Sequence, residues 1–204
     1  APTLTNAERI VENPGGDARN YFFTLYPEND STLWFGNRGY GAYRVNTKSL
    51  ATDTIRIGNQ NHKQTINDVY SIYKEDSNTL WLGTSDGLIR LNEDNEPEVF
   101  SMEQGFLNNT IHGILPEPKN NLWLSTNRGL ILFDTANSNF QIYTEQNGLK
   151  VTEFSDGASY HDMKSDALFF GGINGFVGIT QTGKENIPYR PAILLDKLII
   201  YGES

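Results

Sequence analysis

The sequence predicts an all-β fold made of β-propeller blades, each a four-stranded antiparallel sheet. The first observation is a Leu-Trp-Leu-Gly run at residues 80–83, a glycine turn and a second apolar run, a pattern that recurs at residues 122–134 with serine in place of the first glycine. Related copies begin with Leu-Trp-Phe-Gly at residue 33 and Leu-Phe-Phe-Gly at residue 168. The second observation is the period, since the aromatic residues are 47, 42 and 46 residues apart: Trp34, Trp81, Trp123 and Phe169. A period of about 40–50 residues with several short strands is typical of propeller blades.

The third observation is that positions on both sides of these aromatic anchors repeat as well. Nine residues before the anchors lie Leu25, Ile72, Ile114 and Tyr160. Six residues after them lie Gly87, Gly129 and Gly175, and the first copy has Gly41 at seven. Because a slip of one residue would turn the buried face outward, this spacing predicts one strand pair used four times in the same register.

Each copy contains the strands that a blade needs. In the second copy we expect strands at about residues 69–73, 80–83 and 88–91, with a weaker fourth at 98–100. These runs are rich in β-branched and aromatic residues and are bounded by Gly, Asn, Asp and Ser. The propeller region is expected to cover residues 1–183, with blades at about 20–56, 67–101, 109–143 and 154–182. The four aromatic anchors should pack between blades as structural residues.

Composition excludes several classes of protein. The chain has 204 residues, 37% of them hydrophobic, which indicates a globular protein. It has no cysteine, so disulfides and thiolate metal sites are excluded. No apolar run reaches the length of about 18 residues that a spanning helix needs. The net charge of −9 argues against nucleic acid as a partner.

The C-terminal part differs from the repeats. Residues 183–191 contain two prolines and are expected to form a linker, because proline cannot occupy a central strand. Residues 192–201 are strongly apolar. We therefore expect residues 184–204 to hold a linker and the first strand of a following β-sandwich domain. The Ala-Pro-Thr start suggests a segment excised from a longer protein.

The two best copies, residues 67–92 and 109–134, resemble the two-component regulator propeller repeat. Both have Asn before the first strand, an acidic turn, the Leu-Trp-Leu core and a Gly-Leu pair. Residues 104–109 and 146–149 are similar to its glycine-leucine leader, and residues 187–201 resemble the entry to the immunoglobulin-like domain that follows such propellers in hybrid sensor kinases. The resemblance implies a periplasmic sensor of glycan fragments, part of a ring of about seven blades. The kinase activity and the membrane attachment would lie in other parts of the parent protein.

The turns between the second and third strands are the predicted binding residues. In a propeller these turns cluster on one face around the mouth of the channel, and varied polar residues on a rigid scaffold favour binding. The expected contacts to an oligosaccharide or a partner are Arg38, Tyr40, Asp86, Arg128 and Asn174. Simple solvated turns are the alternative interpretation.

We expect no catalytic site, no metal site and no cofactor. Residues 83–87 match a Gly-x-Ser-x-Gly nucleophile elbow, but a strand follows where the elbow needs a helix. Residues 171–175 are glycine-rich without the dinucleotide spacing. The histidines occupy non-equivalent positions and are expected to line loops or the channel: His62, His112 and His161. Asp156 with Asp162 could form a carboxylate pair, although chance pairs are expected among 25 acidic residues.

Two alternative functions remain open from the sequence. A propeller lyase or lactonase would need inward His or Glu residues that converge at the channel, for which His112 and Glu117 are the candidates. A protein-binding scaffold is the other. An incomplete ring exposes blade faces and strand edges, so we also expect self-association or closure into a small ring.

Overall fold

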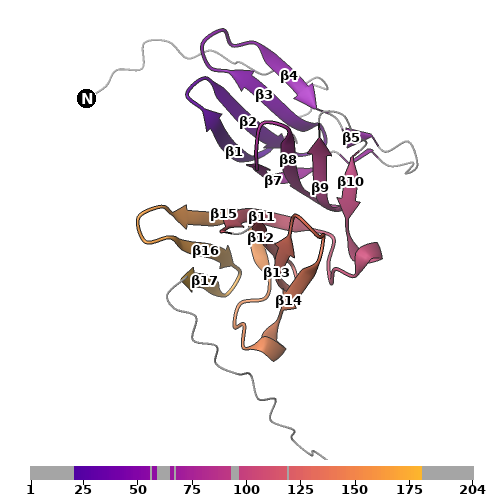
Figure 1. Ribbon diagram of the computed structural model, residues 1–204, viewed down its shortest axis with the longest axis vertical. Helices are drawn as coiled ribbons and strands as arrows, with labels where there is room; N and C mark the ends of the chain where they lie inside the picture. Colours follow the sequence, from indigo (N-terminus) through magenta and orange to yellow (C-terminus); the bar gives the residue numbers. More distant parts are fainter. Residues whose placement is uncertain are drawn as a thin grey trace, which may run out of the picture.

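The computed structural model describes residues 21–55, 57–58, 65–66, 68–92, 97–118 and 120–180. Four small antiparallel sheets are arranged around a common axis as four blades of a β-propeller (Figure 1). This confirms the predicted all-β fold class. The linker and sandwich strand predicted at residues 184–204 lie outside the described residues, as does the stretch before residue 21.

The blades follow one another along the chain, and each begins with its innermost strand. Blade 1 consists of β1 (Phe22–Asn29), β2 (Thr32–Asn37), β3 (Gly41–Asn46) and β4 (Thr52–Ile55). Blade 2 consists of β7 (Val69–Lys74), β8 (Thr79–Thr84), β9 (Gly87–Asn92) and β10 (Glu98–Phe100). Blade 3 consists of β11 (Ile111–Glu117), β12 (Asn121–Thr126), β13 (Gly129–Asp134) and β14 (Phe140–Tyr143). Blade 4 has three described strands, β15 (Phe154–Asp162), β16 (Ala167–Gly172) and β17 (Gly175–Thr180).

Short elements connect the blades. A small ribbon, β5 (Ile57–Gly58) with β6 (Thr65–Ile66), lies between blades 1 and 2. The 3-10 helices η1 (Met102–Gln104) and η2 (Glu145–Asn147) follow β10 and β14, each with a capping box and a left-handed glycine at its end. The glycine-leucine leaders thus form capped turns between blades. In the described part of the chain, no helix is long and apolar enough to cross a bilayer.

The strand register repeats in three blades and shifts in the fourth. Trp34 pairs with Tyr26 and Trp81 with Tyr73, in each case the residue eight positions earlier. Phe169 instead pairs with Tyr160, nine positions earlier. The predicted equivalence of Tyr160 with Leu25, Ile72 and Ile114 is therefore wrong. The cause is the β15–β16 turn, which is one residue longer than the β11–β12 turn.

Hydrophobic clusters fill the spaces between successive blades. Trp34 packs with Val69 and Ile72 between blades 1 and 2, and Trp81 packs with residues of blade 3. Trp123 lies in the cluster between blades 3 and 4. Burial of apolar side chains is the main stabilising contribution to folding. In a repeat structure each blade can bury these side chains only against its neighbours, so the packing between blades holds the fold together.

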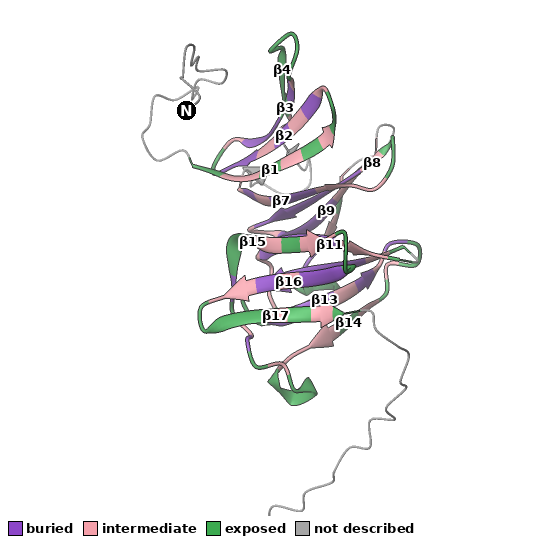
Figure 2. Cartoon of the chain, turned by 90° about the vertical axis from the view of Figure 1, so that its left-hand side faces the viewer, coloured by how far each residue is buried: buried purple, intermediate pink, exposed green. Residues whose placement is uncertain are grey.

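Phe169 does not follow the expectation that all four anchors pack between blades. Its ring is only partly buried and lies 6.3 Å from the ring of Phe176, which is 70% exposed. The residues that match Phe176 in the other blades are buried: Ala42, Leu88 and Leu130. The physical reason is that no hydrophobic cluster of the described residues covers the outer face of blade 4, where β17 is mainly exposed (Figure 2).

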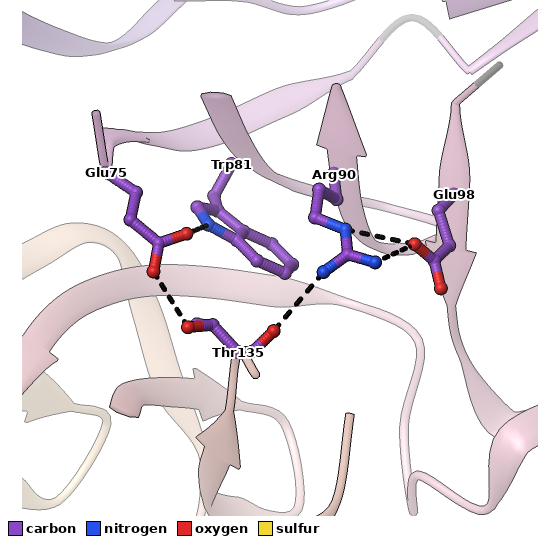
Figure 3. A network of polar contacts seen from close by, with 5 residues as sticks. All are labelled: Glu75, Trp81, Arg90, Glu98 and Thr135. Atoms are coloured by element: carbon purple, nitrogen blue, oxygen red, sulfur yellow. Dashed lines mark hydrogen bonds and ion pairs between the residues drawn. The ribbon is translucent and has the colours of Figure 1, made fainter. Parts of the chain in front are cut away.

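A polar network also joins blades 2 and 3 (Figure 3). Glu75 accepts hydrogen bonds from Trp81 Nε1 and Thr135 Oγ1, both at 2.7 Å. The guanidinium of Arg90 lies 5.5 Å from the centre of the Trp81 ring, pairs with Glu98 and donates to the carbonyl of Thr135. Because Thr135 belongs to blade 3 and the other four to blade 2, the network fixes the orientation of one blade against the next.

Candidate functional site

The four innermost strands share one irregularity near their starts. Each contains a β-bulge, which the pairing places at Phe22/Thr24, Val69/Ser71, Ile111/Gly113 and Phe154/Ser159. A bulge removes residues from the ladder and re-aims their side chains, often beside functional sites. We call the resulting group the axial cluster, and its members are Phe23, Tyr70, His112 and Asp156.

The members of the axial cluster contact one another in order around the axis. The rings of Phe23 and Tyr70 are 4.9 Å apart, and those of Tyr70 and His112 are 5.7 Å apart. His112 Nδ1 lies 2.5 Å from Asp156 Oδ1. The innermost strand of blade 4 contacts those of the other three blades, so the cluster gathers residues from all four blades.

His112 is the most strongly held polar side chain of the cluster. It is buried, and its second ring nitrogen, Nε2, lies 2.7 Å from Asn127 Oδ1. Burial lowers the pKa of His112, but the hydrogen bonds to Asp156 and Asn127 and the negative charges of Asp156 and Glu153 together raise that pKa by more, so the net shift is upward. Two oxygen partners favour the imidazolium form, in which both nitrogens donate.

Tyr70 remains a protonated hydrogen-bond donor throughout the physiological range. Burial, the negative charges of Asp68 and Asp156 and a hydrogen bond with Asp68 raise the pKa of Tyr70 to about 12, against the opposing charge of Arg38. The axial cluster therefore holds an aromatic hydroxyl, an imidazole and a carboxylate, and the charges of Asp68 and Arg38 act on its tyrosine.

An open groove of about 610 Å³ lies beside the axial cluster. The β12–β13 turn forms one wall with Asn127 and Arg128, and the residues around η2 form the other. Leu107 and Ile142 contribute aliphatic side chains to the groove. The polar residues that line it are Asn127, Arg128, Thr144, Glu145, Gln146, Asn147 and Thr152. Asn127 belongs to both places, because it lines the groove and contacts His112.

The structure brings two of the five predicted binding residues to these places. Arg38 acts on the charge balance of Tyr70, and Arg128 lines the groove. Asp86 contacts Ser85 within its own turn, Asn174 is exposed on the β16–β17 turn, and Tyr40 is partly buried in the β2–β3 turn. No contact recorded among the described residues brings these three to the groove or the axial cluster.

Sequence reasoning did not single out Tyr70 or Asn127, and it did not place Asp156 beside His112. A signal for three members of the cluster exists, since Phe23, Tyr70 and His112 each lie eleven residues before an anchor tryptophan. Asp156 breaks that spacing because the bulge of β15 is longer, spanning the residues between Phe154 and Ser159.

The geometry also tests the candidate chemical motifs. The Gly-x-Ser-x-Gly run is the β8–β9 turn with strands on both sides, and the glycine run at 171–175 is the β16–β17 turn. His112 and Glu117 lie at opposite ends of β11, so they do not converge on one site as a lyase would need.

The remaining acidic and histidine candidates are also separated. Asp162 bonds to Ser165 in the β15–β16 turn, away from Asp156, and His161 pairs with Asp166 in the same turn. His62 is outside the described residues. Within the described ranges no three metal-binding side chains come together.

Comparison with known proteins gives a consistent picture of the fold. No family model matches the chain. Histidine kinase P4 of Formosa agariphila is 25% identical over an alignment 232 residues long. The alignment covers 87% of this chain and 17% of that protein.

Solved structures share the architecture at low identity. The extracellular domain of BT3049 from B. thetaiotaomicron, assigned to a hybrid two-component system, matches with a TM-score of 0.58 and 18% identity over 89% of this chain and 30% of that one. The corresponding domain of BT4673 matches with a TM-score of 0.64 and 16% identity over 79% of this chain and 23% of that one. A gluconolactonase, XC5397 of Xanthomonas campestris, matches with a TM-score of 0.56 and 13% identity over 76% of this chain and 55% of that one. The TM-scores show a shared fold, and the identities are too low to show more than that. This chain spans less than a third of the length of the two sensor domains.

Proposed function

We propose that this chain is part of the ligand-sensing propeller of a two-component sensor histidine kinase and lies in the periplasm. The observation that carries the proposal is the groove beside the axial cluster, on the blade end where the β12–β13 turn and η2 meet. Sensor ectodomains among the structural matches and the histidine kinase relative support it.

The proposed ligand is a glycan fragment. Aliphatic Leu107 and Ile142 offer apolar surface for the faces of a sugar ring, while amides, hydroxyls and the guanidinium of Arg128 offer partners for its hydroxyl groups. The ligand would act by favouring one placement of the propeller against the domain that follows it. It can shift that equilibrium only by its difference in affinity for the two placements.

Isothermal titration calorimetry tests the proposal. The ectodomain of the parent protein, with this chain inside it, is titrated with a panel of neutral and acidic oligosaccharides. We expect binding of at least one, weakened about tenfold or more by Arg128→Ala, because a hydrogen bond to a charged group contributes about 1.5–3 kcal/mol. Because Arg128 is exposed, the melting temperature of the Arg128→Ala variant should hardly differ from that of the wild type.

Lys164→Ala is the matched control. It removes a positive charge from the exposed β15–β16 turn, where the backbone N–H of Lys164 bonds to Asp162 and the side chain lies away from the groove. Equal weakening by both variants would argue for a general charge effect. No binding of any oligosaccharide would overturn the glycan assignment.

A further inference from the structure

One imidazole spans the boundary between the groove and the neighbouring blade. His112 Nε2 meets Asn127 of the β12–β13 turn at 2.7 Å, and Asn127 forms part of the groove wall. Its Nδ1 meets Asp156 of blade 4 at 2.5 Å. A displacement of Asn127 therefore has a direct route to the innermost strand of the next blade.

We propose that His112 is a positioning residue that couples the state of the groove to the contact between blades 3 and 4. The role of the groove as the ligand site rests on the proposed function, whereas the coupling itself is a property of the chain alone. A ligand that takes over the amide of Asn127 leaves Nε2 without its acceptor and weakens the hold of the imidazolium on Asp156. Groove occupancy and the blade contact then share one hydrogen-bonded group.

The charges around His112 set the sign of its pH dependence. Asp156 and Glu153 face it from blade 4 and the segment before it, and Tyr70 faces it from blade 2. Asp68 and Arg38 act on Tyr70 with opposite charges. Since the folded pKa of His112 is raised above 6.5, its stabilising contribution is fully present below that value and is lost as the pH rises through the folded pKa.

Nuclear magnetic resonance of the 204-residue chain tests the coupling without any ligand. The imidazole signals of His112 are followed from about pH 5 to 9 in the wild type, Asn127→Ala and Arg128→Ala. Asn127→Ala should lower the pKa of His112 and shift the backbone amides of residues 155–159 in blade 4. Arg128→Ala changes the adjacent groove residue, which does not contact His112, and should do neither.

Thermal unfolding gives a second readout that a purely structural histidine would not produce. His112→Gln should lower the melting temperature more at about pH 5.5 than at about pH 8.5, because the charged form makes the stabilising contacts. His161→Gln removes an exposed His–Asp pair within a single turn and is the control, with a small effect at both values.

Three results decide the proposal. If Asn127→Ala leaves the His112 titration and the blade 4 amides unchanged, the coupling is wrong. If His112→Gln costs the same stability at both pH values, the residue is only a packing element. If the coupling is found but no oligosaccharide binds, the positioning role stands and the proposed glycan ligand fails.

Discussion

Replacing Gly83 by alanine should destabilise the boundary between blades 2 and 3. A Cβ at this position would lie 2.2 Å from Ser71 Oγ and 2.7 Å from the carbonyl oxygen of Ile111 in the next blade. Cβ atoms do not approach other heavy atoms this closely, so β8 or β11 must move. By this reasoning, the second residue after Trp81 is a glycine because neighbouring strands come too close there for a side chain.

The expected cost is that of overpacking a close-packed core, about 1–3 kcal/mol. For a chain of this size each kcal/mol lowers the melting temperature by about 2–4 °C, so Gly83→Ala should melt about 2–12 °C below the wild type. Circular dichroism at the β-sheet band and urea unfolding give two independent measurements of this difference.

Comparison with blade 3 suggests a compensating substitution that tests this prediction. There the same ladder position holds Gly113 opposite Ser125, whereas blade 2 holds Ser71 opposite Gly83. Ser71→Gly should therefore relieve the closer of the two clashes and return part of the stability lost in Gly83→Ala, with a coupling on the order of 1 kcal/mol. Recovery should stay incomplete because the Ile111 carbonyl remains.

Two outcomes would refute this reasoning. One is a melting temperature of Gly83→Ala within about 1 °C of the wild type, below the smallest shift that the clash predicts. The other is simple additivity of the two substitutions, which would mean that Ser71 and the new methyl group do not meet.

Three further predictions concern stability and association. Glu75→Ala removes the acceptor of Trp81 Nε1 and should lower the free energy of unfolding in urea by about 1.5–3 kcal/mol, more than Glu75→Gln, which keeps an amide oxygen. Asp76 accepts two backbone N–H bonds that lower its pKa below 3.8, so its contribution is present above that value and lost as the pH falls through the folded pKa; Asp76→Ala should flatten the acid side of the stability profile. Leu25→Glu and Phe176→Glu each charge an exposed apolar blade face, and should reduce the self-association measured by light scattering.

Each of these predictions has an outcome that contradicts it. Equal stability of the Glu75 variants and the wild type would mean that solvent replaces the bond to the indole. An unchanged acid profile in Asp76→Ala would place the acid sensitivity in other carboxylates. A monodisperse wild-type monomer would remove the basis for association through the blade faces.

The sequence predicts the scaffold well because the scaffold is a repeat. The tryptophan spacing and the glycine after each second strand follow from packing constraints that recur in every blade, as the burial of Trp34 and Trp81 illustrates. The same spacing cannot predict exposure in blades 1 and 4, the first and last of the four. Leu25 is 57% exposed and its counterpart Ile72 only 5%, since burial there depends on a neighbouring blade and not on the residue.

The site was predicted less completely for a different reason. A turn tip such as Asn127-Arg128 is visible in the sequence, but which side chain reaches the axis depends on the twist of the turn. The partner of His112 was hidden because Asp156 lies 44 residues away, in a bulge whose length differs from the others. Long-range pairs of this kind require the three-dimensional arrangement of the blades.

The bulge explains how one repeated strand can carry different chemistry in each blade. Val69 and Ile111 stay in the ladder, are fully buried and must be apolar, because the adjacent blade packs on them. The next residue, Tyr70 in one blade and His112 in the other, leaves the ladder and faces the axis. Its identity can therefore change without disturbing the packing between blades. A polar axial cluster is compatible with apolar packing between blades one residue away, so binding groups can diversify while the fold is kept.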